Sequence, residues 1–221
     1  MNVSEALVKR KSVRAYLEKP VETEKIKRIL EKAGHAPSGA NTQPWQVAVV
    51  QGDKKAEIEE AILKAFQAGD SGGMDYKYYP DDWAEPYKER RKVCGIQLYQ
   101  SLGIAKDDTD SRINQWIANF RAFDAPVALY FFLDSVMGTG SYLDYGMYLQ
   151  SLMLAAVEEG LASCPQAALG QYPAIVKDKL GYPVESILIC GMALGYEDTD
   201  AAVNGYRTSR EKTDSYTRYF D

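Results

Sequence analysis

The spacing of apolar residues along the chain predicts seven helices and three buried strands. In residues 22–35, Ile26, Ile29, Leu30 and Ala33 recur at the i, i+3, i+4, i+7 spacing of one helix face. Three unbroken apolar runs instead indicate buried strands. The predicted strands are residues 45–51, 125–134 and 185–196, and the predicted helices are residues 4–10, 22–35, 53–68, 86–103, 107–121, 142–159 and one that ends near residue 181. Few strands and many helices indicate an α+β or α/β layered protein.

The helix predicted over residues 142–159 is apolar nearly all the way round. Its apolar residues include Leu143, Met147, Leu152 and Val157. A helix without a polar face is buried on every side. We therefore expect it at the centre of a domain or in an interface between subunits.

Two loops stand out between these elements. Residues 36–45, APSGANTQPW, hold two prolines and a glycine among short polar residues, which predicts a rigid, irregular loop with directed amides. We interpret it as one wall of a cofactor site. Residues 69–86 form a longer loop that carries Tyr76, Tyr78, Tyr79 and Trp83. It is either a lid over a binding site or an insert that only packs or is disordered.

Composition limits the class of protein. The chain has 221 residues, a net charge of -5 and 46% hydrophobic residues, which fits one globular domain with an inserted segment over about residues 69–121. The acidic balance argues against general nucleic-acid binding. The longest apolar stretch is too short to cross a membrane, and the N-terminus lacks the apolar core of a signal peptide. The three cysteines form no CxxC pair, so we expect a reducing, cytoplasmic setting, although the sequence leaves a single disulfide open.

Histidine is almost absent, and this bears on the chemistry. With His35 as the single histidine, neither a histidine-based metal cluster nor a serine–histidine–acid triad has its parts. The chain also lacks the glycine-rich GxGxxG and GxxxxGK[ST] patterns. We therefore expect no metal, and we expect that any catalysis relies on a bound cofactor.

Basic residues near the N-terminus suggest one contact for such a cofactor. Arg10, Ser12 and Arg14 alternate, so in an extended segment their side chains point the same way. A hydroxyl between two guanidinium groups suits a phosphate monoester. A solvated basic turn would look the same in sequence, so both interpretations stay open here.

Five segments together resemble one known family. In order they are KRKSVRAY, APSGANTQPW, GLASCPQAAL, CGMALGY and YRTSR, and they span nearly the whole chain. This set resembles the nitroreductase family of FMN flavoproteins. The resemblance implies an α+β, three-layer sandwich with a central mixed or antiparallel sheet flanked by helices. It also implies an intertwined homodimer that holds two FMN molecules in the interface.

The resemblance also implies where FMN binds. Arg10, Ser12 and Arg14, together with Arg210 and Arg207, match residues near the phosphate and the ribityl chain. A loop from the partner subunit would lie against the isoalloxazine, and a second loop would bring a backbone amide to flavin N5. The residues of these two loops are Pro37, Ser38, Asn41 and Gln43 in the first, and Pro165, Gln166, Ala167 and Ala168 in the second.

The chain departs from the family pattern at two positions. Ala167 stands where many relatives have a glutamate, and Thr208 where many have a lysine. The contact with N5 is a backbone contact, so we expect Ala167 to keep it. Asn119 and Arg121 lie about where the family places groups that face flavin N1 and O2.

The function that the resemblance implies is hydride transfer from NADH or NADPH to FMN and then to a small nitroaromatic or quinone-like acceptor. Donor and acceptor would alternate in one pocket, and Tyr76, Tyr78, Tyr79 and Trp83 would offer faces on which a flat acceptor stacks. Two alternatives stay open. One is a relative that carries out reductive dehalogenation or flavin fragmentation, and the other is a flavin-binding protein without turnover.

Overall fold

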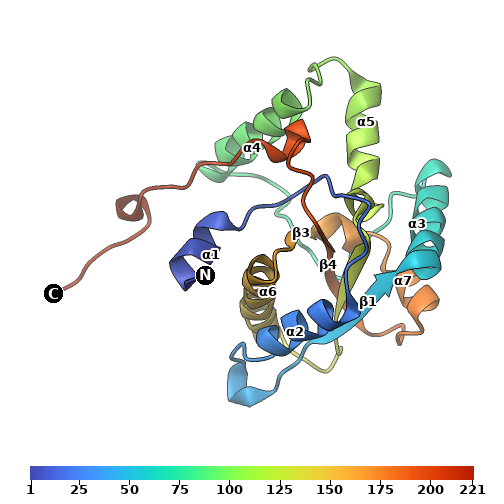
Figure 1. Cartoon of the computed structure of the whole chain (residues 1–221). Helices are drawn as coiled ribbons and strands as arrows, with labels where there is room; N and C mark the ends of the chain where they lie inside the picture. The colour runs from blue at the N-terminus through green and yellow to red at the C-terminus, as the bar shows by residue number, and fades with distance from the viewer.

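The computed structural model describes all 221 residues and contains one antiparallel sheet of four strands. The strands are β1 (Gln46–Gln51), β2 (Val127–Leu133), β3 (Ala162–Gln166) and β4 (Ile187–Gly195), and their order across the sheet is β1-β2-β4-β3. Helices cover both faces of this sheet, which gives the predicted three-layer α+β fold (Figure 1). The helices are α1 (Val3–Lys9), α2 (Thr23–Ala33), α3 (Gly52–Gln67), α4 (Tyr87–Ser101), α5 (Thr109–Ala118), α6 (Gly140–Glu158) and α7 (Pro173–Leu180).

Strand β2 shows why the sheet needs a helix layer on each side. All seven of its residues are buried, and successive side chains point to opposite faces. Leu129 and Phe131 belong to the core under α2 and α6. Tyr130 and Phe132 belong to the core under α3 and α7. The unbroken apolar run in the sequence is therefore the pattern of a strand covered on both faces.

Strand β3 is a correction to the sequence-based assignment. The segment from Cys164 to Ala168 was expected to be a loop, but Ala162–Gln166 pairs with β4 along the edge of the sheet. Proline is tolerated in edge strands because one side of such a strand needs no backbone donors. The strand reads ASCPQ, which contains a proline and no residue of high β propensity. The sequence therefore showed no sign of a strand here.

Helix α6 is only partly covered within a single chain. Nine of its residues are buried, but the helix is not covered on every side. Leu143 is 72% exposed, and Met147 and Leu154 are half-buried on the same face. One apolar stripe of α6 is thus open within a single chain. No helix of the chain has the length and hydropathy needed to cross a membrane.

The hydroxyl of Tyr145 ties α6 to the sheet. Tyr145 is 1% exposed; its Oη accepts a hydrogen bond from the Gln46 N–H at 2.8 Å and donates to the Phe132 carbonyl. Gln46 and Phe132 face each other at the end of the β1–β2 pair. One side chain therefore satisfies backbone groups of two strands.

Replacing Tyr145 with phenylalanine removes only this hydroxyl. We expect Tyr145→Phe to lower the free energy of unfolding by about 1–3 kcal/mol, because it removes the hydroxyl donor from the buried Phe132 carbonyl. Urea denaturation measures the change. Tyr148→Phe is the matched control, since the Tyr148 ring is equally buried on α6 but its hydroxyl makes no hydrogen bond within the chain. Equal effects of the two variants would contradict the assignment.

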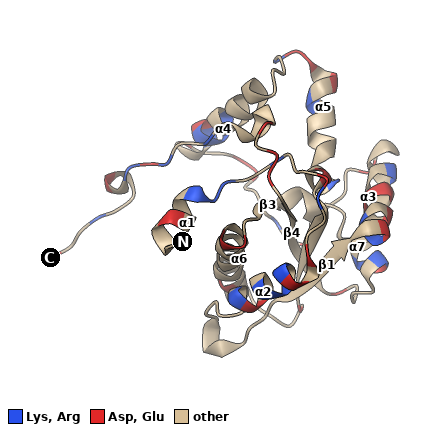
Figure 2. Ribbon diagram, in the orientation of Figure 1, with Lys and Arg blue, Asp and Glu red and all other residues tan.

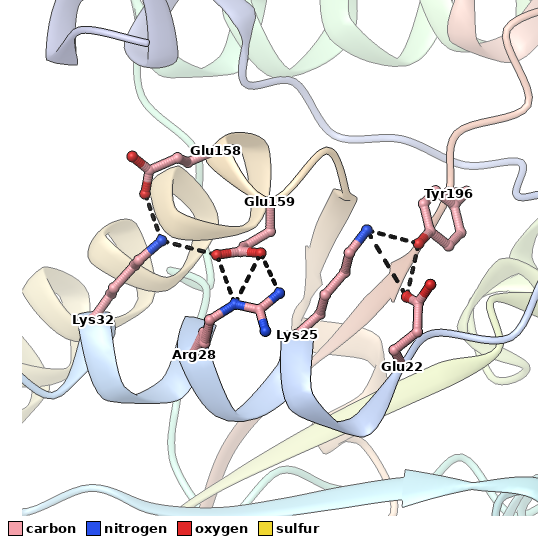
Figure 3. Close-up of polar contacts among 7 residues, drawn as sticks. All are labelled: Glu22, Lys25, Arg28, Lys32, Glu158, Glu159 and Tyr196. Carbon is pink, nitrogen blue, oxygen red and sulfur yellow. Dashed lines mark hydrogen bonds and ion pairs between the residues drawn. The ribbon is translucent and has the colours of Figure 1, made fainter.

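Ion pairs connect α2 to the C-terminal end of α6 (Figure 3). The guanidinium of Arg28 binds Glu159 at 2.8 Å, and the Lys32 ammonium lies 2.9 Å from the same carboxylate. These two partners lower the pKa of Glu159 to about 2. On the neighbouring turn of α2, the Tyr196 hydroxyl contacts both Lys25 and Glu22, which joins α2 to the end of β4.

The lowered pKa of Glu159 makes part of the stability depend on pH. The folded pKa of about 2 lies below the unfolded value of about 4.3. The contribution is therefore complete above about pH 5 and is lost as the pH falls toward 2. We expect Glu159→Gln to be less stable than the original chain at pH 7, and we expect that difference to shrink at pH 3 in urea denaturation.

Glu158→Gln serves as the control for this pH dependence. Glu158 makes one ion pair, with Lys32, and its side chain is 51% exposed. It should therefore show a smaller difference from the original chain at both pH values. A loss of stability in Glu159→Gln that stays constant between pH 7 and pH 3 would count against the ion-pair interpretation.

Candidate functional site

A cavity of about 610 Å³ opens between α1, α4, α6 and the C-terminal segment. Five of its twelve lining residues are lysine or arginine, and none is aspartate or glutamate. Figure 2 shows the basic residues that follow α1 and the chain that returns past α4. The lining residues are Leu7, Val8, Arg10, Lys11, Ser12, Arg14, Cys94, Gln150, Tyr206, Arg207, Thr208 and Arg210. We call this cavity the cation pocket.

The charges in the cation pocket are not balanced by carboxylates. Lys11 pairs with Glu197 at 2.7 Å, but Arg10, Arg14, Arg207 and Arg210 form no ion pair. Burial, and then the charges of Arg210 and Arg207, lower the pKa of Arg10. Like charges held together in a partly buried cavity favour an anion as the missing partner.

Two contacts with the body of the protein position these residues. Ser12 forms a parallel bridge with Ser163 of β3, and the Val13 N–H donates to the Ser163 carbonyl at 3.1 Å. The segment is therefore extended at Ser12 and Val13, which is the condition under which the alternation of Arg10, Ser12 and Arg14 would direct their side chains the same way. All three side chains line the same cavity.

Asn204 holds the N-terminal and C-terminal segments together, and the sequence analysis missed it. This side chain is 3% exposed. Its Oδ1 accepts from the Arg14 N–H at 2.9 Å, and its Nδ2 donates to the carbonyls of Ala15 and Asp198 at 2.9 and 2.8 Å. No local pattern marks Asn204, because its partner Arg14 lies 190 residues away. Lys11, Gln150 and Tyr206 were also missed, because the cation pocket brings together segments that lie far apart in the chain.

Strand β3 leads away from the cation pocket to the loop predicted at flavin N5. Ser163 lies beside Ser12, and Ala167 follows four residues later, which is about 13 Å of extended chain. Pro165, Ala167 and Ala168 are half-buried, so this end of the strand borders an open surface. The predicted phosphate contacts and the predicted N5 loop thus lie along one strand.

Gln166 and Asn119 meet at the end of β3. The Gln166 Nε2 donates to the Asn119 carbonyl at 3.0 Å. The buried Gln166 Oε1 has no hydrogen-bond partner, and neither has the buried Ser163 Oγ at the other end of the strand. Two polar atoms with free hydrogen-bonding capacity therefore lie along β3.

Arg121 lies apart from this pair. Its guanidinium binds Asp124 at 2.8 Å. Ala122, Phe123 and Asp124 form a left-handed turn with φ of 49°, 53° and 59°, a conformation that costs about 1–2 kcal/mol per non-glycine residue. The structure therefore places Asn119 beside Gln166 and directs the Arg121 side chain to Asp124.

The polar loop after α2 does not reach the cation pocket of its own chain. Pro37, Ser38, Asn41 and Gln43 are absent from the residues that line it. The loop is nevertheless held in shape. The Gly39 N–H donates to the buried carboxylate of Asp144 on α6 at 3.1 Å, and the Gln43 N–H donates to the Ser38 Oγ at 2.9 Å.

The aromatic segment after residue 69 is packed onto the body of the protein. The Tyr76 hydroxyl donates to the Ile189 carbonyl of β4 at 2.8 Å. Beyond it, the rings of Tyr78, Tyr79 and Trp83 follow one another at centroid distances of 6.2, 4.6 and 5.6 Å. The four predicted stacking residues therefore form one continuous row, with Tyr78 and Tyr79 half-exposed at 49% and 55%.

The family follows from comparison with known proteins. The sequence model of the nitroreductase family matches residues 7–196. The chain belongs to the nitroreductase family. Among curated relatives, it is 37% identical over 210 residues to 4-nitrobenzoate reductase of Pseudomonas putida, and the match covers 95% of this chain and 92% of that protein.

Solved structures of this family share the fold over the full length. The chain superposes with a TM-score of 0.97 and 40% identity on the FMN and NADPH-dependent nitroreductase NfnB from Sphigopyxis sp. strain HMH. It superposes with a TM-score of 0.93 and 36% identity on the FMN-dependent nitroreductase NfnB from Mycobacterium smegmatis in complex with NADPH. Each match covers 100% of both chains.

Dehalogenating relatives match less of this nitroreductase-family chain. Iodotyrosine deiodinase of Nematostella vectensis is 31% identical over 118 residues, which is 50% of this chain and 44% of that protein. The reductive dehalogenation alternative is therefore not favoured.

The unbalanced charge of the cation pocket gives a test that needs no cofactor. Arg10→Gln removes one of four crowded guanidinium groups, so we expect the protein to melt at an unchanged or higher temperature without ligand. The rise in melting temperature on adding inorganic phosphate should shrink, since affinity falls about tenfold or more with the loss of a charge-assisted contact. Thermal unfolding in phosphate and in chloride of equal ionic strength measures both effects.

Arg218→Gln is the matched control for Arg10→Gln. Arg218 is exposed in the C-terminal segment and lies outside the cation pocket. We expect this variant to respond to phosphate like the original chain. If Arg10→Gln keeps the full phosphate response, the cation pocket is not an anion site.

Proposed function

We propose that this chain binds FMN and is an NADPH-dependent oxidoreductase that reduces nitroaromatic compounds. The observation that carries the proposal is the cation pocket, with four guanidinium groups that form no ion pair, joined by β3 to the open loop at Ala167. Relatives of similar length are named for the same cofactors and for nitrobenzoate and nitrobenzene. The same reaction could also use NADH as the hydride donor and a quinone-like compound as the acceptor.

The residues present fit FMN. A phosphate monoester carries the negative charge that the cation pocket lacks, and Arg10, Ser12 and Arg14 would hold it together with Arg207 and Arg210. The ring system would lie at Pro165, Gln166, Ala167 and Ala168. The flavin supplies the capacity to accept a hydride from one substrate and give it to another.

The chain's own residues would orient the flavin and tune its charge. The backbone amide of Ala167 is the donor that would face N5. The Asn119–Gln166 pair places amide groups near the same end of β3, where a hydrogen-bond donor or a nearby cation favours an anionic reduced ring. Replacing Asn119 or Gln166 with an apolar residue would remove an amide that could stabilise this negative charge.

We further propose that the working unit is a homodimer. The apolar stripe of α6, with Leu143, Met147 and Leu154, is open within one chain and suits burial against a second copy. The loop of Pro37, Ser38, Asn41 and Gln43 is held rigid away from the cation pocket of its own chain. A second copy that supplies this loop would complete the flavin site.

Acceptor binding would use the row of aromatic rings. Tyr76, Tyr78, Tyr79 and Trp83 offer ring faces for a flat molecule. We also propose a reducing, cytoplasmic setting, because Cys94, Cys164 and Cys190 are all free and Cys94 is exposed.

The proposed function predicts a spectroscopic result. The purified protein should be yellow with bound FMN, and NADPH should bleach it under anaerobic conditions. Adding 4-nitrobenzoate to the reduced protein should then restore the colour. Absorbance at the flavin band follows both steps.

Each alternative function predicts a different outcome. A protein that stays colourless and gains no activity with added FMN would overturn the proposal. A yellow protein that neither donor bleaches would indicate flavin binding without turnover. Reduction of halotyrosines in preference to nitroaromatics would indicate the dehalogenase alternative.

A further inference from the structure

Helix α4 begins with a dense run of positive charge. Lys88, Arg90, Arg91 and Lys92 fall within its first six residues (Figure 2). Two of these charges are balanced, since Arg90 binds Glu211 at 3.1 Å and Lys92 binds Glu89 at 3.1 Å. Lys88 and Arg91 form no ion pair with any carboxylate of the chain. They are three residues apart, so they share one face of the helix.

Arg91 is also held against an aromatic ring. Its guanidinium carbon lies 5.2 Å from the centre of the Trp83 ring, and the Tyr79 ring follows Trp83 at 5.6 Å. A guanidinium stacked on a ring keeps its N–H donors directed outward in the plane of the group. Arg91 is exposed, so these donors face solvent. The arrangement pairs a free cation with two ring faces.

This face of α4 borders the cation pocket. Cys94 lies three residues, about 4.5 Å of helix rise, beyond Arg91 and lines that cavity. The ion pair between Arg90 and Glu211 attaches the same part of α4 to the C-terminal segment. Arg210, the residue before Glu211, also lines the cavity. Arg91 thus contacts the aromatic row on a helix that also reaches the cation pocket, and Lys88 shares its face of that helix.

We propose that Arg91, supported by Lys88, forms an anion subsite that binds the phosphate or carboxylate of a ligand whose flat ring stacks against Trp83 and Tyr79. The proposal rests on the proposed function, because it assigns this subsite to the same donor and acceptor. Two sources can supply the chemistry. One is the 2′-phosphate on the adenosine of NADPH, and the other is the carboxylate of an acceptor such as 4-nitrobenzoate. The balanced charges of Arg90 and Lys92 leave Arg91 and Lys88 as the free cations of this turn.

The 2′-phosphate of NADPH and the carboxylate of the acceptor can be distinguished because the donor and the acceptor react in different half-reactions. The test uses stopped-flow absorbance of the FMN-loaded protein and compares Arg91→Gln with the original chain. The reductive half-reaction is measured with NADPH and with NADH. The oxidative half-reaction is measured with 4-nitrobenzoate and with nitrobenzene, after anaerobic reduction of the flavin by dithionite.

The expected result is a loss of discrimination in one half-reaction. If the subsite binds the phosphate, the preference for NADPH over NADH falls about tenfold or more, while the acceptor ratio is unchanged. If it binds the carboxylate, the preference for 4-nitrobenzoate over nitrobenzene falls by a similar factor, while the donor ratio is unchanged. Arg91→Lys keeps the charge and should retain part of the preference.

Arg112→Gln is the matched control. Arg112 on α5 also stacks on a ring, 4.1 Å from the centre of Tyr99, but it belongs to neither the cation pocket nor the aromatic row. We expect both ratios to stay unchanged in this variant. If Arg91→Gln leaves both ratios unchanged, or slows all four substrates equally, the proposal is wrong.

Direct binding keeps the test independent of turnover. Isothermal titration measures the affinity of the unreduced protein for adenosine 2′-phosphate against adenosine, and for 4-nitrobenzoate against nitrobenzene. Arg91→Gln should weaken one of the two anions about tenfold or more and leave its neutral counterpart unchanged. A failure of the proposed function appears differently, as a protein that neither NADPH nor NADH reduces. No difference between an anion and its neutral counterpart in the original chain would overturn the subsite itself.

Discussion

Repulsion among the guanidinium groups of the cation pocket is the constraint on which the site depends. Arg10, Arg14, Arg207 and Arg210 come from opposite ends of the chain, and no carboxylate lines the cavity that they share. Such an arrangement opposes folding unless other contacts hold it. Those contacts are the bridge between Ser12 and Ser163 and the three hydrogen bonds of the buried Asn204 amide. The energy of packing elsewhere in the chain therefore maintains the arrangement that we propose as an anion site.

The sheet makes this possible because it is rigid on both faces. Strands β2 and β4 lie at its centre between two apolar cores, and β3 lies at its edge. An edge strand has one side free, so β3 can bind the N-terminal segment at Ser163 and present Pro165 to Ala168 to an open surface. Stability is concentrated in the centre of the sheet, and the proposed cofactor site is built along its margin.

Several elements lack a contact partner within a single chain. The apolar stripe of α6 has no cover, α5 has no buried residue, and the loop at Pro37 to Gln43 does not line the cation pocket of its own chain. Each would gain a partner in a dimer of the kind that we propose. The hydrogen bond from Gly39 to Asp144 connects the loop to α6, so the exposed helix and the loop would enter an interface together.

The sequence by itself determined the layers and most of the chemistry. The apolar runs of β2 and β4, and the helical periodicity of α2 and α3, depend on local spacing, which is readable along the chain. The alternation of Arg10, Ser12 and Arg14 likewise indicated that their side chains would point the same way if the segment were extended. The spaced motifs, taken with their order, indicated the family that comparison then confirmed.

Only the tertiary structure decided which of these residues come together. It paired Asn119 with Gln166, directed Arg121 to Asp124, turned the segment at Pro165 into an edge strand, and left one face of α6 open. It also revealed Asn204 and the free cations on α4. The reason is physical, because charge balance and hydrogen-bond satisfaction are set by contacts between segments far apart in the chain, and periodicity records only which face of an element is apolar.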